Sequence, residues 1–240
     1  MTSMKFIKAE NYEELSKIGA DFFVQQLNEK PASVLGLATG GTPEGLYKQL
    51  VTSYKQGEVS FENAVTFNLD EYIGITEDNA ASYHHYMAEN LFKHVNIQAS
   101  NINLPKGNVA DPEASTVAYE ALIARAGGID LQLLGIGVNG HIGFNEPHTP
   151  FTATTTIIEL TPSTRKANQI YFDKLEDVPT HAITMGIQTI LNAKKIVLVM
   201  SGKSKQKAFE QLRSGKVSED FPASALHLHN DVTIIYTDID

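Results

Sequence analysis

The chain has 240 residues, of which 42% are hydrophobic and 20% are charged, and its formal net charge at pH 7 is −9. This length suits one large domain with its own core. A chain this acidic is a poor candidate for binding nucleic acid or an anionic membrane, and no apolar run approaches the ~20 residues that span a bilayer. Because it contains no cysteine, disulfide bonds, thiolate metal sites and cysteine nucleophiles are excluded. A reducing, cytoplasmic setting is the one we expect.

Short apolar runs alternate with amphipathic stretches along the chain. Strands are predicted over residues 5–9, 33–38, 64–68, 131–136, 154–159, 195–200 and 232–236, and helices over 12–27, 43–54, 82–94, 112–126, 162–171 and 204–214. Several strand runs are apolar throughout, which is typical of a sheet that is covered on both faces. The alternation predicts a Rossmann-like α/β fold, a layered α/β/α sandwich with a mostly parallel central sheet, as one domain over residues 1–240.

Three of the predicted helices begin with the same pair of residue types. Thr42, Asp111 and Thr161 each precede a proline. A hydroxyl or carboxylate at the cap, followed by proline at the first helical position, is a common helix start. We therefore expect these three side chains to be N-caps.

The first segment that could carry chemistry joins a predicted strand to the helix predicted over 43–54. It contains Thr39, Gly40, Gly41 and Thr42. Glycines let the backbone approach a ligand, and free N–H groups in the first turn of a helix favour an anion. The segment predicts a phosphate-binding loop, and the alternative is a tight turn without a ligand. It lacks the Gly-Lys-Ser/Thr ending of a nucleotide P-loop.

Two adjacent carboxylates, Asp70 and Glu71, follow the strand predicted over 64–68. Ligands of open α/β sheets bind at the carboxyl ends of strands, so either group could be a general base. The alternative is that one of them caps the loop that follows. The spacing does not distinguish the two side chains.

A glycine-rich segment follows the strand predicted over 131–136. Gly135, Gly137 and Gly140 match the dinucleotide fingerprint G-x-G-x-x-G, but prolines replace the helix that the fingerprint requires, so we treat the match as accidental. The loop presents His141 and Glu146 close together, which is the composition of an acid/base pair. The alternative is a structural histidine that is bonded to the backbone.

Two isolated bases lie near predicted helix starts, Arg165 and Lys205. Either could bind a phosphate, Arg165 through two parallel hydrogen bonds and Lys205 as a point charge, and the alternative is a solvated surface residue. Two histidine pairs, 84–85 and 227/229, lack a third ligand at a suitable spacing, so no metal site is predicted.

Taken together, three motifs resemble the glucosamine-6-phosphate deaminase family: Thr-Gly-Gly-Thr-Pro at 39–43, Asn-Leu-Asp-Glu-Tyr at 68–72, and Gly-His-Ile-Gly-Phe-Asn-Glu-Pro at 140–147. The resemblance extends over nearly the whole chain. It implies the conversion of glucosamine 6-phosphate and water to fructose 6-phosphate and ammonia, with a small-molecule substrate and no cofactor. The related 6-phosphogluconolactonases share the first motif and lack the Phe-Asn-Glu-Pro ending of the third.

The resemblance also implies residue roles. Asp70 would be the base that moves a proton from C2 toward C1, and His141, oriented by Glu146, would shuttle the proton that opens the sugar ring. The phosphate would be held by Thr39, Gly40, Gly41, Thr42, Arg165 and Lys205.

Two departures from the family pattern carry further expectations. Asn139, which we count with the catalytic residues, stands where many members have aspartate. An asparagine can orient the imidazole of His141 by a hydrogen bond but cannot stabilise an imidazolium by charge, so the pKa of His141 should depend chiefly on Glu146. The stretch 148–158 has no Lys or Arg, whereas allosteric hexameric members use basic residues there, and the C-terminal extension of longer members is absent. We therefore expect an unregulated monomer, with a homo-oligomer as the alternative, and a mobile lid at about 149–172.

Other function classes remain as alternatives: a phosphorylated-lactone hydrolase, a non-catalytic sugar-phosphate sensor and a nicotinamide dehydrogenase. A lactonase has no use for a C2 base at Asp70, and a sensor would be expected to lose Asp70, His141 or Glu146. The dehydrogenase rests only on the glycine fingerprint that fails its context.

Overall fold

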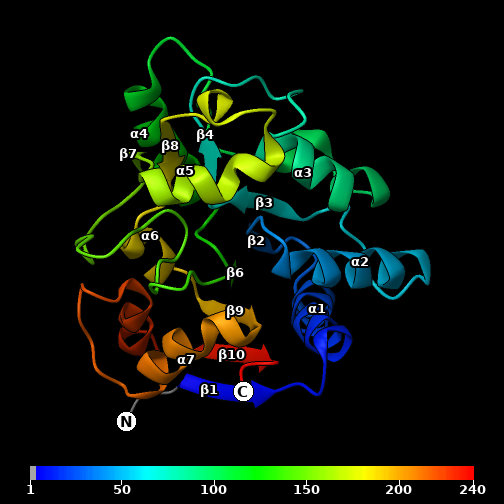
Figure 1. The fold of residues 1–240 in the computed structure, drawn as a ribbon. Helices are drawn as coiled ribbons and strands as arrows, with labels where there is room; N and C mark the ends of the chain where they lie inside the picture. The colour runs from blue at the N-terminus through cyan, green and yellow to red at the C-terminus, as the bar shows by residue number, and fades with distance from the viewer. Residues whose placement is uncertain (1–3) are drawn as a thin grey trace.

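A parallel seven-stranded sheet forms the centre of the computed structural model, which describes residues 4–240 (Figure 1). Its order is β1-β10-β9-β6-β2-β3-β5, and every pair of neighbours is parallel. The strands are β1 (Met4–Lys8), β2 (Val34–Leu37), β3 (Val65–Asn68), β5 (Ile102–Asn103), β6 (Leu131–Leu134), β9 (Lys195–Ser201) and β10 (Val232–Thr237). The predicted α/β fold with a mostly parallel central sheet is confirmed.

Helices cover both faces of this sheet. The Gly19 position of one helix lies against Val199 of β9, whereas the Phe209 ring of another lies 4.4 Å from that of Tyr236 in β10. The pairing of β9 with β10 sets Val199 beside Ile235, so Val199 and Tyr236 point to opposite faces. The helices are α1 (Tyr12–Glu29) and α2 (Thr42–Lys55) on the first face and α7 (Gln206–Arg213) on the second.

A second, antiparallel sheet lies beside the first. It has the order β4-β8-β7 and is built from β4 (Asp70–Tyr72), β8 (His181–Thr184) and β7 (Thr156–Glu159). The strand predicted over 154–159 therefore forms but belongs to this second sheet, and β4 and β8 were not predicted. The remaining α-helices are α3 (Tyr83–Asn90), α4 (Pro112–Arg125), α5 (Pro162–Asn168) and α6 (Ile187–Leu191).

Two of the three predicted N-caps are confirmed. Asp111 accepts from the backbone N–H of Ala114, and Thr161 accepts from that of Thr164. The prediction for Thr42 is wrong, because Gly41 already has helical dihedral angles and is itself the cap, with no side-chain hydrogen bond. The Thr42 hydroxyl is thereby left without a capping role.

Three predicted helices are shorter than expected. Those over 82–94 and 162–171 end in 3₁₀ turns, at Phe92–His94 and Gln169–Tyr171, and that over 204–214 begins with the turn Lys203–Lys205. No helix in residues 4–240 has the length and apolarity needed to cross a membrane.

Candidate active site

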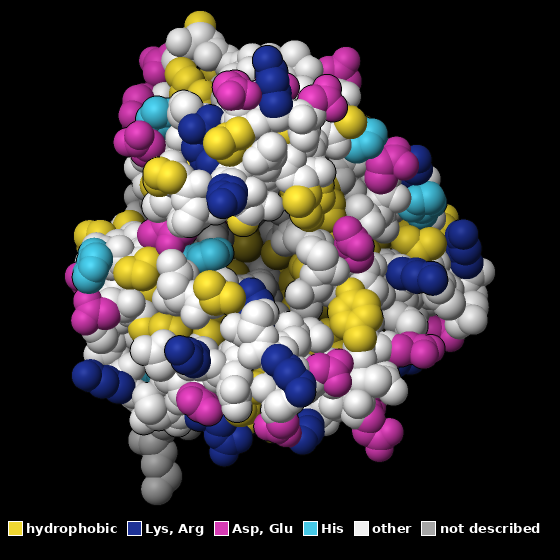
Figure 2. All heavy atoms as spheres, in the orientation of Figure 1, with side chains coloured by type: hydrophobic (Ala, Val, Ile, Leu, Met, Phe, Trp, Pro, Cys, Tyr) yellow, Lys and Arg dark blue, Asp and Glu magenta, His cyan; other side chains and the backbone are white. Residues whose placement is uncertain are grey.

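The candidate site lies at the carboxyl ends of four adjacent strands. Segments that follow β9, β6, β2 and β3, neighbours in that order, line one cavity of about 570 Å³. Figure 2 shows the opening as a hollow near the middle of the molecular face. Ligands of open α/β sheets bind where successive strand connections diverge, and here the chain passes from β2 to β3 on one side and from β6 to β9 on the other.

The loop after β2 presents unpaired donors to this cavity. Within residues 4–240, the backbone N–H groups of Thr39, Gly40, Gly41 and Thr42 donate to no other protein group, and all four residues line the cavity. Gly40 has φ +119°, which favours glycine, whereas Gly41 has φ −72° and a Cβ there would meet no neighbour. No described protein atom occupies the space beside the Gly41 backbone, so an anionic ligand can approach the backbone there.

Lys205 brings a cation to the same cavity from the turn after β9. Its Nζ donates to the Ile136 carbonyl at 2.6 Å, and burial lowers the pKa of the Lys205 ammonium. One hydrogen bond leaves other ammonium protons for a ligand. The cation and the loop of N–H groups together fit a phosphate.

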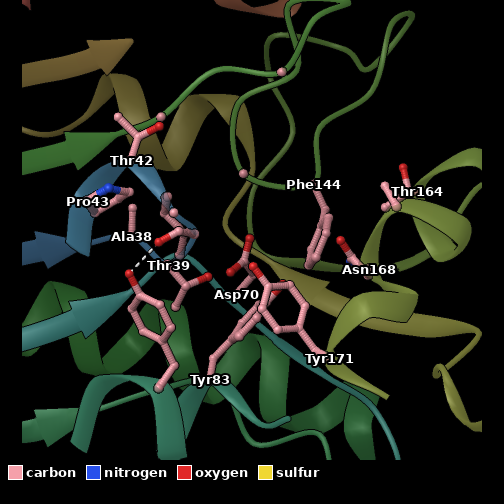
Figure 3. A pocket seen from close by; sticks show the side chains of 18 of the residues that line it. Ala38, Thr39, Thr42, Pro43, Asp70, Tyr83, Phe144, Thr164, Asn168 and Tyr171 are labelled. Carbon is pink, nitrogen blue, oxygen red and sulfur yellow. Dashed lines mark hydrogen bonds between the residues drawn. The ribbon is translucent and has the colours of Figure 1, made fainter. Parts of the chain in front are cut away.

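Asp70 lies in the cavity between the Thr39 loop and the side chains of Phe144 and Asn168 (Figure 3). The residue is 7% exposed, and no described group donates a hydrogen bond to its carboxylate. Burial, followed by the negative charge of Glu71, raises the pKa of Asp70 to about 8. Asp70 is thus an unpaired carboxyl group whose pKa is close to neutral, as a general base requires.

Glu71 has a structural role instead. Its Oε1 accepts from the backbone N–H groups of Tyr72 and Tyr83, and its Oε2 accepts from that of His84 and lies 2.7 Å from His84 Nδ1. Glu71 therefore caps the first turn of α3, and the alternative left open by the spacing applies to Glu71 rather than to Asp70.

His141, Asn139 and Glu146 form a hydrogen-bonded chain. Asn139 Oδ1 accepts from the backbone N–H of His141 and lies 2.8 Å from its Nδ1, while Asn139 Nδ2 donates to Glu146 Oε2 at 2.7 Å. Glu146 Oε1 is 3.8 Å from Nδ1 and accepts from the Thr164 hydroxyl. Because an amide oxygen only accepts, Nδ1 carries the proton and Nε2 is the free base of the neutral ring.

This geometry differs from the expectation for His141 in one respect. Asn139 makes the short contact with the imidazole, and Glu146 orients the ring mainly through Asn139. Burial is the largest influence on His141 and lowers its pKa, whereas the charge of Glu146 raises it. Desolvation therefore outweighs the carboxylate, and the imidazole is neutral at pH 7.

The glycines that match the dinucleotide fingerprint shape the loop that presents His141. A Cβ on Gly137 would lie 1.9 Å from Cε1 of His141, so the imidazole packs directly on the Gly137 backbone. Gly140 has φ +85°, and a Cβ there would lie 2.2 Å from the ring of Phe221. These glycines are needed for loop shape and do not indicate a dinucleotide site.

Arg165 is the one predicted phosphate contact that the structure does not bring to the cavity. Its guanidinium donates to the carbonyls of Val178 at 2.9 Å and Leu175 at 3.3 Å, and its Nε is buried without a partner. Arg165 lies near the start of α5, as predicted, but its side chain points toward residues 175–178 and not into the cavity.

Sequence reasoning missed several side chains that complete the cavity. They are contributed by α3, by the histidine loop and by α5 with the turn after it, and Figure 3 shows them around Asp70: Tyr83, Phe144, Thr164, Asn168 and Tyr171. Neither periodicity nor spacing distinguishes such residues from ordinary packing. In residues 4–240 no group of three or more histidine, aspartate or glutamate side chains is arranged to hold a metal ion.

Comparison with known proteins agrees with this geometry. Residues 9–235 match the family of glucosamine-6-phosphate isomerases/6-phosphogluconolactonase. The chain is 57% identical to a glucosamine-6-phosphate deaminase of Lysinibacillus sphaericus, over 97% of this chain and 98% of that one. It is 51% identical to glucosamine-6-phosphate deaminase 1 of Bacillus subtilis, over 97% and 96%.

Solved structures divide into a near relative and distant ones. A monomeric glucosamine-6-phosphate deaminase superposes with a TM-score of 0.96 at 50% identity, over 98% of both chains. The 6-phosphogluconolactonase of Thermotoga maritima superposes with a TM-score of 0.77 at 17% identity, over 98% of this chain and 99% of that one, which shows the shared fold alone. This chain belongs to the family of glucosamine-6-phosphate isomerases and 6-phosphogluconolactonases.

Proposed function

We propose that this chain converts glucosamine 6-phosphate and water to fructose 6-phosphate and ammonia. The observation that carries the proposal is that one cavity contains a loop of free N–H groups, a buried unpaired carboxyl group and an imidazole with a free Nε2. Relatives at 50–57% identity that bear the deaminase name support it.

The chemistry needs an anchor, a proton shuttle and a base. We assign the phosphate to the N–H groups of residues 39–42 and to Lys205, which fixes the sugar at the end away from the reacting carbons. His141 Nε2 accepts the proton of the C1 hydroxyl and returns it to the ring oxygen, so the ring opens to the aldehyde. Asn139 and Glu146 hold the imidazole for that transfer.

Asp70 acts on the open chain. Its carboxylate removes the proton from C2 and delivers it to C1, while O1 gains a proton and the amine nitrogen loses one. The C1 aldehyde thereby becomes the C1 alcohol and the amine at C2 becomes an imine, with no net change in the number of protons. Water adds to the imine carbon and ammonia leaves, which gives the ketone of fructose 6-phosphate. The raised pKa of Asp70 makes its carboxylate a stronger base than an ordinary aspartate. Because this pKa is close to neutral, the protonated form can still return the proton to C1.

Arg165 as a further phosphate ligand also belongs to the proposal. To reach the phosphate, its guanidinium would have to leave the carbonyls of Val178 and Leu175. A lid at about residues 149–172 that moves as the substrate enters provides such a change, since α5 lies within it and contributes Thr164 and Asn168 to the cavity.

The assembly state and the location of the protein are part of the same proposal. We propose that the enzyme acts as a monomer, as the near structural relative is described, and that it works in the cytoplasm.

The test is an assay of ammonia and fructose 6-phosphate release from glucosamine 6-phosphate, run beside hydrolysis of 6-phosphogluconolactone. We expect equal amounts of the two products, no lactone hydrolysis above the blank, and loss of product in Asp70→Asn. Hydrolysis of the lactone without ammonia release would instead support the lactonase alternative. Binding of the sugar phosphate with neither reaction would indicate a sensor.

A further inference from the structure

Three tyrosine hydroxyl groups, one from each of three helices, converge on the backbone of the loop after β2. Tyr47 of α2 donates to the Ala38 carbonyl at 2.5 Å and accepts from the Ala38 N–H at 3.1 Å. Tyr86 of α3 donates to the Gly40 carbonyl at 2.5 Å. Tyr12 of α1 lies 3.1 Å from the Gly41 carbonyl and 2.7 Å from the Thr42 carbonyl.

We propose that Tyr12, Tyr47 and Tyr86 are positioning residues that hold this loop so that its N–H groups face the phosphate of the substrate. The inference rests on the proposed function, because it assumes that the loop binds the phosphate of a sugar phosphate.

Peptide geometry supplies the argument. In a trans peptide the C=O and the next N–H point in opposite directions, and the described chain has no cis peptide bond. A hydroxyl on the Ala38 carbonyl therefore orients the Thr39 N–H, one on the Gly40 carbonyl orients the Gly41 N–H, and one on the Gly41 carbonyl orients the Thr42 N–H. These are the N–H groups that have no protein acceptor in residues 4–240.

Tyr12 also fills the place that the sequence assigned to Thr42. Its hydroxyl accepts from the backbone N–H of Gly45 at 2.9 Å, so it satisfies a donor in the first turn of α2. Thr42 is therefore not needed as a helix cap, and its hydroxyl is available to a ligand.

The tyrosines are suited to fixed donation. Burial raises the pKa values of Tyr47 and Tyr86 above the ordinary value, so both hydroxyls remain protonated at any working pH. Tyr86 also lines the cavity itself, and its helix α3 is capped by Glu71, the residue after the base. One helix therefore contacts both the phosphate loop and the strand that carries Asp70.

The test removes the hydroxyl groups singly in Tyr12→Phe, Tyr47→Phe and Tyr86→Phe. Tyr54→Phe is the matched control, since Tyr54 lies on α2 and its hydroxyl makes no hydrogen bond within residues 4–240. Two quantities are measured: the Kd of inorganic phosphate by calorimetry, and kcat and KM for glucosamine 6-phosphate. The melting temperature of each variant shows that it is folded.

We expect Tyr12→Phe and Tyr86→Phe to weaken phosphate binding and raise KM roughly fivefold each, the effect of about one hydrogen bond, with kcat changed less than twofold. Tyr54→Phe should match the wild type. Folded variants whose phosphate Kd is unchanged would overturn the inference, as would a wild type that does not bind phosphate. If Kd depends on the tyrosines but glucosamine 6-phosphate is not consumed, the proposed reaction fails and the positioning role stands.

Discussion

The Asp70 carboxyl group is buried with no hydrogen-bond donor among the described residues, so its charged form is poorly solvated. Its pKa rises from 3.8, the value for an exposed aspartate, to about 8 in the folded protein. The folded state therefore holds this proton more tightly than the unfolded state does. The resulting stabilisation is present below pH 3.8 and is lost as the pH rises toward 8.

Asp70→Asn should consequently inactivate the protein and stabilise it. At pH 8 we expect a gain in the free energy of unfolding of roughly 1–3 kcal/mol, and a smaller gain at pH 5, where Asp70 is already neutral. Urea unfolding at the two pH values measures the difference, and Asp78→Asn, at an exposed position, is the control. A variant less stable than the wild type at pH 8 would contradict the account.

Asn139 offers a second test at the residue scale. In Asn139→Asp a negative charge would stand 2.8 Å from Nδ1 of His141, so the imidazolium should be stabilised and the pKa of His141 should rise. An NMR titration of the imidazole in the free protein measures the shift. No upward shift would count against this account of the His141 environment.

The distinction between Asp70 and Glu71 marks the limit of sequence reasoning for single residues. The strand end and the pair of carboxylates were predictable, because buried strands and their carboxyl ends leave a local pattern. Which carboxylate faces the cavity depends on α3, whose backbone N–H groups engage Glu71. That contact joins segments that no local pattern relates.

At the scale of elements, helix α5 connects the histidine chain to the second sheet. Thr164 donates to Glu146, and Asn168 donates to the Tyr72 hydroxyl at 2.8 Å. The helix thus closes one side of the cavity, and Arg165 on the same helix faces away from it.

If α5 moves as a lid that delivers Arg165 to the phosphate, Arg165→Met should raise KM for glucosamine 6-phosphate roughly ten- to hundredfold, the effect of one or two charge-assisted hydrogen bonds. Lys166→Met, at the adjacent exposed position, should leave KM near the wild-type value. Steady-state kinetics of both variants provide the measurement. A lower melting temperature of Arg165→Met with KM unchanged would restrict Arg165 to holding residues 175–178.

All parallel strands except the two-residue β5 were predicted, whereas β4 and β8 of the small sheet were not, for a physical reason. Strands buried on both faces are continuous apolar runs, such as β9. β4 has three residues, two of them acidic, and forms a strand because β8 pairs with it. The Thr42 cap was mispredicted because Gly41 already has helical dihedral angles and is itself the cap. A donor in the first turn of α2 is instead satisfied by the Tyr12 hydroxyl, which is distant in sequence.

For the whole molecule, the surface charge bears on assembly and on regulation. The chain carries a net charge of −9, and residues 148–158 contain no Lys or Arg to bind a second sugar phosphate. In sedimentation analysis we expect a monomer of about 26.3 kDa. We also expect hyperbolic kinetics whose shape does not change when N-acetylglucosamine 6-phosphate is added. A hexamer, or sigmoidal kinetics that this sugar phosphate relieves, would be the contrary result.

The most direct test of the central claim follows the hydrogen at C2. Glucosamine 6-phosphate deuterated at C2 is incubated with the wild type and with Asp70→Asn, and NMR records the label at C2, at C1 and in water. The wild type should move the deuterium from C2 to C1 of fructose 6-phosphate or release it to solvent, and the variant should leave it at C2. Label transfer by the folded variant at the wild-type rate would show that another group is the base.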